Sequence, residues 1–289
     1  MHIIDLEALG MPGDDSSAAN QGARDCSPVW NSTMPGVKEG DTLLLPPRYC
    51  AFKSPIIPLP NGVKLLGQGS GSHMVRCFSQ SPGEFFLTTG VSDSWVEGVR
   101  IWTADGASGG NAIGRHATSP DDAPYHTVLK NIEITRFTSG RWSNGVWIDG
   151  TLGTPMYGAR RAQFENLIVS GCDDIGMWLG GMNSASGTNI ILGAGGPTWA
   201  LWLYGTASNP SAQIKLDGPI DGTILMYATL TTRVEAASVE WVIMDGNCVS
   251  SEVEASYMNH EPPVLLGQNL TVRANGKTWR SSQNGTITA

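Results

Sequence analysis

The chain has 289 residues, of which 36 are glycine, a formal net charge of -8 at pH 7 and only 15% charged residues. This acidic balance argues against nucleic acid as a partner, because nucleic acids are bound chiefly through basic surfaces. No apolar run approaches the roughly 18–20 residues of a membrane-spanning helix, so membrane insertion is not expected. Few charges and many glycines favour short strands joined by tight corners over a helical protein.

Residues 1–40 are predicted to form an N-terminal arm and a short capping helix. Acidic residues occupy the positions where a signal peptide would need a basic region and an apolar core, so no secretion signal is expected. Within residues 13–21, Asp15 or Ser16 can cap the first amide groups of a helix, which the following alanines favour. Such a helix would cover one open end of a stack of strands.

Three motifs in the first quarter of the chain point to a known family. Residues 14–15 are paired acids before the expected helix, residues 43–49 form a strand that ends in Pro-Pro and an aromatic, and residues 60–69 contain Pro-Asn-Gly-Val and Leu-Gly-Gln-Gly. In these motifs the chain resembles the pectate-lyase-like, right-handed parallel β-helix proteins that are common as bacteriophage tailspikes and capsule depolymerases. Arg48 departs from the family's usual glycine after Pro-Pro. The resemblance implies the fold and a polysaccharide ligand, without identifying the glycan.

A repeated pattern of two short alternating runs fills residues 131–246. The copies begin at Asn131, Asn166, Asn189, Gln213 and Arg233, about 20–35 residues apart. A repeat of this length is typical of a solenoid, and apolar residues at every second position indicate strands. Leucine is too sparse for a leucine-rich repeat.

The predicted fold class is therefore all-β: a parallel β-helix (solenoid) with a short N-terminal capping helix, right-handed as the resemblance implies. The β-helix is expected over residues 41–250, with residues 251–289 as a C-terminal cap or oligomerisation segment. Residues 106–124 are predicted to be a loop, because they are rich in Gly, Ser, Asp and Pro.

The cysteines suggest a protein that folds in a reducing cytoplasm. They are odd in number, scattered and without metal-like spacing, which favours buried reduced thiols over disulfides or a metal site. We therefore predict neither a metal nor a cofactor. The five residues are Cys26, Cys50, Cys77, Cys172 and Cys248.

Large aromatic residues recur in the second run of each repeat, and Trp147, Trp178, Trp202 and Tyr204 are the predicted substrate-binding residues. Aliphatic residues flank each tryptophan, so strand alternation turns the aliphatics inward and the indoles outward. A wide exposed apolar stripe is unusual on a soluble monomer. Three interpretations are open: an interface between subunits packed along their length, a sugar-binding groove, and a long loop that covers the stripe.

Acidic residues near this stripe are the predicted catalytic residues: Asp149, Asp173 and Asp174. Glycosidic cleavage uses two carboxylates, whereas a polysaccharide lyase uses a base. Glu133 and Asp245 are further candidate acids, and His116 is assigned to a loop without a nucleophile pattern. Acids at corners are also commonly solvated turn residues. Catalysis, as a glycoside hydrolase or a polysaccharide lyase, therefore stays open.

These features predict a tailspike-like virion protein of a bacteriophage that binds, and in one version cleaves, bacterial surface polysaccharide. The expected partners are that polysaccharide, two further copies of the chain in a homotrimer, and other tail proteins of the virion. The expected location is the virion tail, after folding in the cytoplasm of the bacterial host. The alternatives are a non-catalytic structural or adaptor fibre of the same fold, and a bacterial polysaccharide lyase or epimerase.

Overall fold

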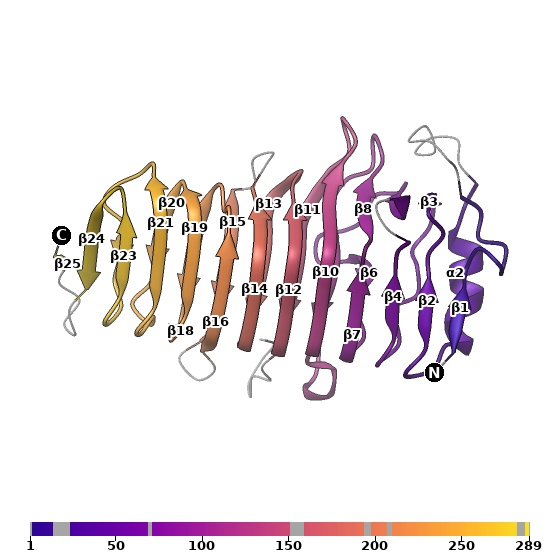
Figure 1. Cartoon of the computed structure of the whole chain (residues 1–289), viewed down its shortest axis with the longest axis horizontal. Helices are drawn as coiled ribbons and strands as arrows, with labels where there is room; N and C mark the ends of the chain where they lie inside the picture. The colour runs from indigo at the N-terminus through magenta and orange to yellow at the C-terminus, as the bar shows by residue number, and fades with distance from the viewer. Residues whose placement is uncertain are drawn as a thin grey trace.

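The computed structural model describes residues 2–13, 24–68, 71–150, 159–193, 198–206, 210–281 and 287–288. The protein is nearly all β, with 56% strand and 5% helix. Its strands lie side by side along the longest axis of the molecule, with the N-terminus at one end and the C-terminus at the other (Figure 1). The predicted all-β class with parallel sheets of many strands is confirmed.

The larger sheet has 17 strands. They are β1 (Ile3–Asp5), β2 (Thr42–Leu44), β3 (Tyr49–Phe52), β4 (Lys64–Leu66), β5 (His73–Arg76), β7 (Ser92–Glu97), β8 (Arg100–Thr103), β10 (Tyr125–Arg136), β12 (Ala159–Val169), β14 (Met182–Leu192), β16 (Ser211–Gly218), β18 (Thr229–Leu230), β19 (Arg233–Val239), β21 (Glu252–Met258), β23 (Thr271–Ala274), β24 (Lys277–Ser281) and β25 (Ile287–Thr288). Except at β24 and β25, neighbouring strands come from consecutive repeats and pair in parallel, as β10 does with β12 and β12 with β14.

The smaller sheet has eight strands, and all of its pairings are parallel. They are β6 (Phe85–Thr88), β9 (Asn111–His116), β11 (Trp142–Asp149), β13 (Cys172–Gly180), β15 (Trp199–Tyr204), β17 (Thr223–Tyr227), β20 (Trp241–Met244) and β22 (Val264–Leu265). Strand β9 lies within residues 106–124, so the prediction of a loop there is wrong. The short 3-10 helix η3 (Pro120–Asp122) follows β9.

The long strands of the larger sheet bend at a single residue. The first half of β10 pairs with β7 and its second half with β8, and Asn131 lies between the halves. The φ angles of Asn131, Asn166 and Asn189 are 52°, 50° and 54°, in the left-handed region that asparagine tolerates. Each amide donates to the carboxamide oxygen of the preceding one, at 2.8 and 2.9 Å. The asparagines that begin the first three predicted repeats therefore form a stacked column, the asparagine column.

A second left-handed column runs beside the start of these strands, and the sequence did not reveal it. Its residues fall at equivalent positions of successive repeats and all have positive φ. They are Gly40, Gly62, Asp93, His126, Arg161, Ser184, Gln213, Thr231, Ser250 and Asn269.

Two of the five predicted repeat starts are consequently wrong. Gln213 belongs to the second left-handed column, level with Ser184, and Arg233 pairs with Lys215. The residue level with Asn189 is Gly218. Each repeat has two corners, and after the third copy the asparagine that marks one of them is replaced. The prediction therefore assigned Gln213, which lies at the other corner, as the start of the fourth repeat.

Alternate residues of both sheets point into one apolar core. The core is a single cluster that extends from Leu6 to Trp279 and includes the aliphatic residues on either side of each predicted outward tryptophan. Strand alternation therefore places side chains as the sequence predicted. All five cysteines are free thiols, and Cys77 alone among them is partly exposed.

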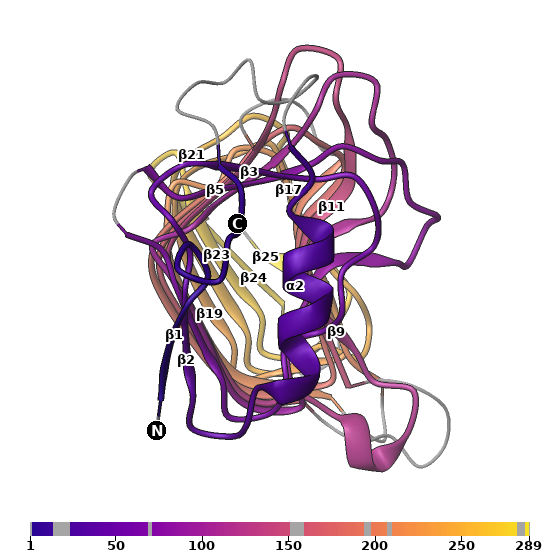
Figure 2. The same cartoon turned by 90° about the vertical axis from the view of Figure 1, so that its right-hand side faces the viewer.

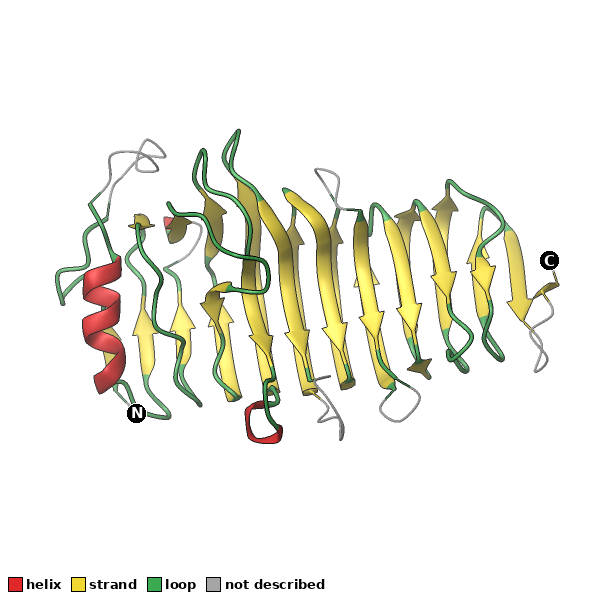
Figure 3. Ribbon diagram, turned by 180° about the vertical axis from the view of Figure 1, so that it is seen from behind, coloured by secondary structure: helices red, strands yellow, loops and turns green. Residues whose placement is uncertain are grey.

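One α-helix covers the N-terminal end of the stack. Helix α2 (Ser27–Thr33), with a proline in its first turn, lies across that end and continues into the 3-10 helix η1 (Met34–Gly36) (Figures 2 and 3). The buried Trp30 fixes it, because its Nε1 donates to the carbonyl oxygen of Ile57 at 2.8 Å. Residues 14–23, where the sequence predicted the helix, lie outside the described residues.

The C-terminal end is arranged differently. Strand β21 pairs in parallel with β19 and β23, so parallel pairing extends beyond residue 250. Strand β24 then pairs antiparallel with β23, and β25 pairs antiparallel with β24. The helices of the described residues are too short and too polar to cross a bilayer.

Candidate functional site

The three predicted tryptophans form a stacked row on the outer face of the smaller sheet. Trp147, Trp178 and Trp202 occupy paired positions of β11, β13 and β15. The ring centroids of Trp147 and Trp178 are 4.4 Å apart with planes at 3°, and those of Trp178 and Trp202 are 4.4 Å apart at 50°. All three side chains are partly exposed, whereas the residues flanking them in sequence are buried.

Two tyrosines extend the row along the same face. Tyr204 lies 5.4 Å from Trp178 between ring centroids, and it stacks on Tyr227 at 5.3 Å and 17°. Tyr227 is 38% exposed. We call the set of Trp147, Trp178, Trp202, Tyr204 and Tyr227 the aromatic row.

Self-stacking decides what the aromatic row offers to a partner. The faces of Trp147 and Trp178 lie against each other, which leaves less ring face for a partner, whereas Trp202 is tilted relative to Trp178. Trp147 differs, because the strand before it carries Gly114 at the paired position and no side chain from that column covers its other face. The Nε1 atoms of all three indoles are buried and have no hydrogen-bond partner among the described residues.

Asp149 lies at the end of this row and is buried. Asp149 is only 3% exposed, although strand alternation from the outward Trp147 places position 149 on the outer face and predicts an exposed carboxylate; that prediction is wrong. His116 lies on the neighbouring strand, with its Nδ1 3.3 Å from Asp149 Oδ2. The carboxylate occupies space left by Gly180, since a Cβ there would lie 2.5 Å from Asp149 Oδ1 and 2.7 Å from the Nε1 of Trp178.

The predicted catalytic acids do not come together. Asp149 ends β11 and pairs with Gly180, whereas Asp173 and Asp174 stand near the other end of β13. Gly180 follows Asp174 by six positions, which corresponds to about 20 Å along a strand. A pair made of Asp149 and either of these aspartates is therefore ruled out for glycosidic cleavage, which needs the carboxyl groups within about 10 Å.

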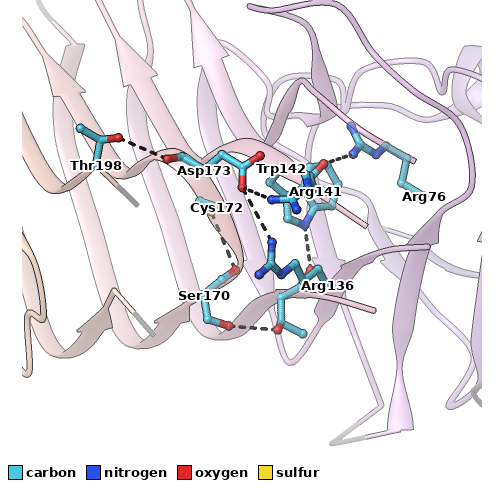
Figure 4. A network of polar contacts seen from close by, with 9 residues as sticks. Arg76, Arg136, Arg141, Trp142, Ser170, Cys172, Asp173 and Thr198 are labelled. Carbon is cyan, nitrogen blue, oxygen red and sulfur yellow. Dashed lines mark hydrogen bonds and ion pairs between the residues drawn. The ribbon is translucent and has the colours of Figure 1, made fainter. Parts of the chain in front are cut away.

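Asp173 belongs to a network of ion pairs. Its Oδ1 lies 3.0 Å from Arg141 and 3.7 Å from Arg136, and both guanidinium groups point toward it (Figure 4). The backbone oxygen of Asp173 accepts a hydrogen bond from the amide of Thr198 at 3.2 Å. These contacts join β13 to the end of β10 in the larger sheet and to the residues just before β11 and β15, and they indicate a structural role. Asp174 is exposed.

A groove lies on the larger sheet, beside the asparagine column. It has a volume of about 600 Å³. The residues that line it are Leu66, Gly67, Glu97, Gly98, Arg100, Asn131, Ile132, Glu133, Asn166 and Ile168. Of these residues, the sequence pattern identified Glu133 as a candidate acid. It did not identify Glu97 or Arg100 as candidate site residues.

The sequence also missed His116. Because β9 lies in a segment that reads as a loop, the pairing of His116 with Asp149 had no signal in the pattern. The candidate site thus comprises the aromatic row, the Asp149–His116 pair and, on another face, the groove. Within the described residues no three His, Cys, Asp or Glu side chains gather in a way that would hold a metal ion.

Comparison with known proteins does not assign the chain to a family. No protein-family model matches it, and neither a curated protein nor a solved structure is significantly similar to it.

Proposed function

We propose that the chain is a right-handed parallel β-helix of the tailspike type that binds bacterial surface polysaccharide. Parallel pairing between consecutive repeats and the stacked asparagines support a solenoid. The sequence motifs of residues 43–49 and 60–69 support the resemblance to pectate-lyase-like proteins, and strands β2, β3 and β4 lie in or beside them. On this proposal the protein belongs to a virion tail and folds in the host cytoplasm.

The aromatic row is the observation that carries the proposal. Its phenol and indole rings offer apolar surface, and sugars have apolar C–H faces that pack against such rings. Trp147 lies beside His116 and Asp149, where an aromatic side chain and polar groups converge. We therefore place the strongest sugar contact at this end of the row.

A second candidate function is a structural or adaptor fibre without affinity for glycans. The self-stacking of Trp147 and Trp178 favours it, because rings that contact each other at 4.4 Å have fewer faces left for a ligand. Both candidates allow a homotrimer and contacts with other tail proteins, since a stripe of aromatic edges also suits a subunit interface.

The test is binding of the full chain to purified capsules and lipopolysaccharides from a panel of bacteria. Trp147→Ala is expected to weaken binding about tenfold or more, because the indole at the proposed end of the site is lost. Trp241→Ala is the matched control, since Trp241 is a partly exposed tryptophan of the same sheet outside the aromatic row. Binding that survives Trp147→Ala would move the site elsewhere, and absence of binding across the panel would favour the fibre.

A further inference from the structure

The residues at the start of the capping helix α2 hold it to strand β3. Asp25 forms a parallel bridge with Ala51, and the backbone amide of Cys26 donates to the carbonyl oxygen of Ala51 at 2.7 Å. The hydroxyl group of Ser27 donates to the carbonyl oxygen of Ser54 at 3.2 Å. These bonds fix the entry of α2, which lies across the N-terminal end of the stack, beside the first strands (Figure 2).

Two cysteine side chains meet beneath this contact. Cys26 immediately precedes α2, Cys50 belongs to β3, and both lie in the apolar core, with exposed fractions of 0% and 1%. The two thiols are in hydrogen-bond contact, and this contact, together with burial, raises the pKa of Cys26. Hydrogen-bonded thiols are already close to the separation at which a disulfide forms, so rotation of the two short side chains brings the sulfur atoms together.

A bond between these sulfur atoms would close a loop around the N-terminal cap. Cys26 and Cys50 are 24 positions apart, and the elements α2, η1 and β2 lie between them. In the thiol form, hydrogen bonds and apolar packing hold these elements to the first strands, with the buried Trp30 as the anchor of the helix. A cross-link would restrict the chain in the opened state, and it would therefore stabilise the closed cap.

Access to the two thiols depends on the cap. The thiolate is the species that attacks an oxidant, and the raised pKa of Cys26 disfavours it while the cap is closed. Local opening of the N-terminal end exposes both side chains to solvent, and oxidation proceeds from that opened form. A reducing compartment keeps thiols free during folding, whereas an oxidising medium allows disulfides to persist. The compartment therefore sets the state of this pair.

We propose that Cys26 and Cys50 form a redox-dependent lock on the N-terminal cap, open as thiols in a reducing compartment and closed as a disulfide in an oxidising medium. The oxidant is a low-molecular-weight disulfide such as oxidised glutathione. One protein thiolate attacks a sulfur atom of the oxidant and releases the first glutathione, and the second thiolate attacks the mixed disulfide and releases the other. The protein thiols lose two electrons, and their protons and these electrons end on two molecules of reduced glutathione.

The test uses the full chain, purified with a reducing agent and then incubated with oxidised glutathione. Two of the five free thiols should be lost, and digestion with mass spectrometry should recover a disulfide between Cys26 and Cys50. The melting temperature should rise by about 5 °C and fall again when dithiothreitol is added. Cys50→Ala should abolish both changes. Cys172→Ala is the matched control and should keep both, since Cys172 is equally buried, at 1%, but begins β13.

Three results would overturn the proposal. Thiols that all stay free up to just below the melting temperature would show that the pair does not bond. Glutathione attached to the partly exposed Cys77, without a bond between Cys26 and Cys50, would show that exposure and not proximity governs oxidation. A disulfide that forms without raising the melting temperature would show that it does not lock the cap. Where Cys50→Ala fails to fold, the disulfide map and the melting temperatures of the unaltered protein still decide.

Discussion

Trp178→Ala is expected to destabilise the protein and to break the aromatic row at its centre. The indole lies between Trp147 and Trp202, with centroid distances of 4.4 Å on both sides. A tryptophan buries roughly 150–250 Å² when packed, and about 100–150 Å² is a fair share for a partly exposed one. At about 25 cal/mol per Å² this burial contributes about 3 kcal/mol, and two ring contacts add about 0.5–1.5 kcal/mol each.

The expected loss in the free energy of unfolding is therefore about 4–6 kcal/mol. It would be measured by urea denaturation followed by far-ultraviolet circular dichroism, with the near-ultraviolet signal reporting the stacked indoles. A double-mutant cycle with Trp147→Ala isolates the ring contact, for which we expect a coupling of about 0.5–1.5 kcal/mol.

Two results would refute this reasoning. A loss below about 1 kcal/mol for Trp178→Ala would mean that the row does not support the fold. A coupling indistinguishable from zero would mean that the two indoles do not stack in solution. Trp241→Ala provides the comparison, because Trp241 has no tryptophan on a neighbouring strand.

Three further predictions concern the scaffold. Arg76→Met should lower the free energy of unfolding by about 4 kcal/mol, measured by urea titration. The fully buried guanidinium group donates hydrogen bonds to several backbone and side-chain oxygens, which would lose their partner. A change of less than about 1 kcal/mol would contradict this role. Asn166→Ala should lower the free energy of unfolding by about 2 kcal/mol, because it removes side-chain hydrogen bonds of the asparagine column and leaves alanine with a left-handed φ. Asn166→Gly should lower it less, because glycine tolerates that φ. Equal shifts of the melting temperature for the two variants would disprove the backbone contribution. Hydrogen bonds from the backbone amides of Lys38 and His2 lower the pKa of Asp41, so its carboxylate stabilises the fold above the ordinary carboxyl pKa. This stabilisation is lost as the pH falls through the lower pKa of the folded state. Asp41→Asn should therefore flatten the pH dependence of the denaturation midpoint below about pH 4, and an unchanged slope would exclude this contribution.

Much of the fold was predictable because its interactions are local and repeated. The asparagines at 131, 166 and 189 recur with the strands they join, and alternation around Trp147, Trp178 and Trp202 correctly divided buried from outward residues. Such periodic signals need no knowledge of distant contacts. They weakened after residue 189, where Gly218 replaces asparagine and the alignment slipped to Gln213.

The candidate site depended on register, which periodicity does not reveal. Asp149 reads as an exposed turn acid, yet it is buried because Gly180 leaves it room and His116 lies beside it. Likewise Glu97 and Glu133 are 36 positions apart in sequence, and the turn at Gly98 brings both to one groove.

The sequence by itself therefore determined the all-β class, the inward and outward faces of the strands and the aromatic row, because each follows from the order of neighbouring residues. Only the tertiary structure decided that the indoles stack on each other, that Asp149 and Asp173 lie far apart and that Glu97 and Glu133 share a groove. The physical reason is that parallel strands from successive repeats set these neighbours, and their register follows from corner conformations and packing that the sequence pattern encodes only weakly.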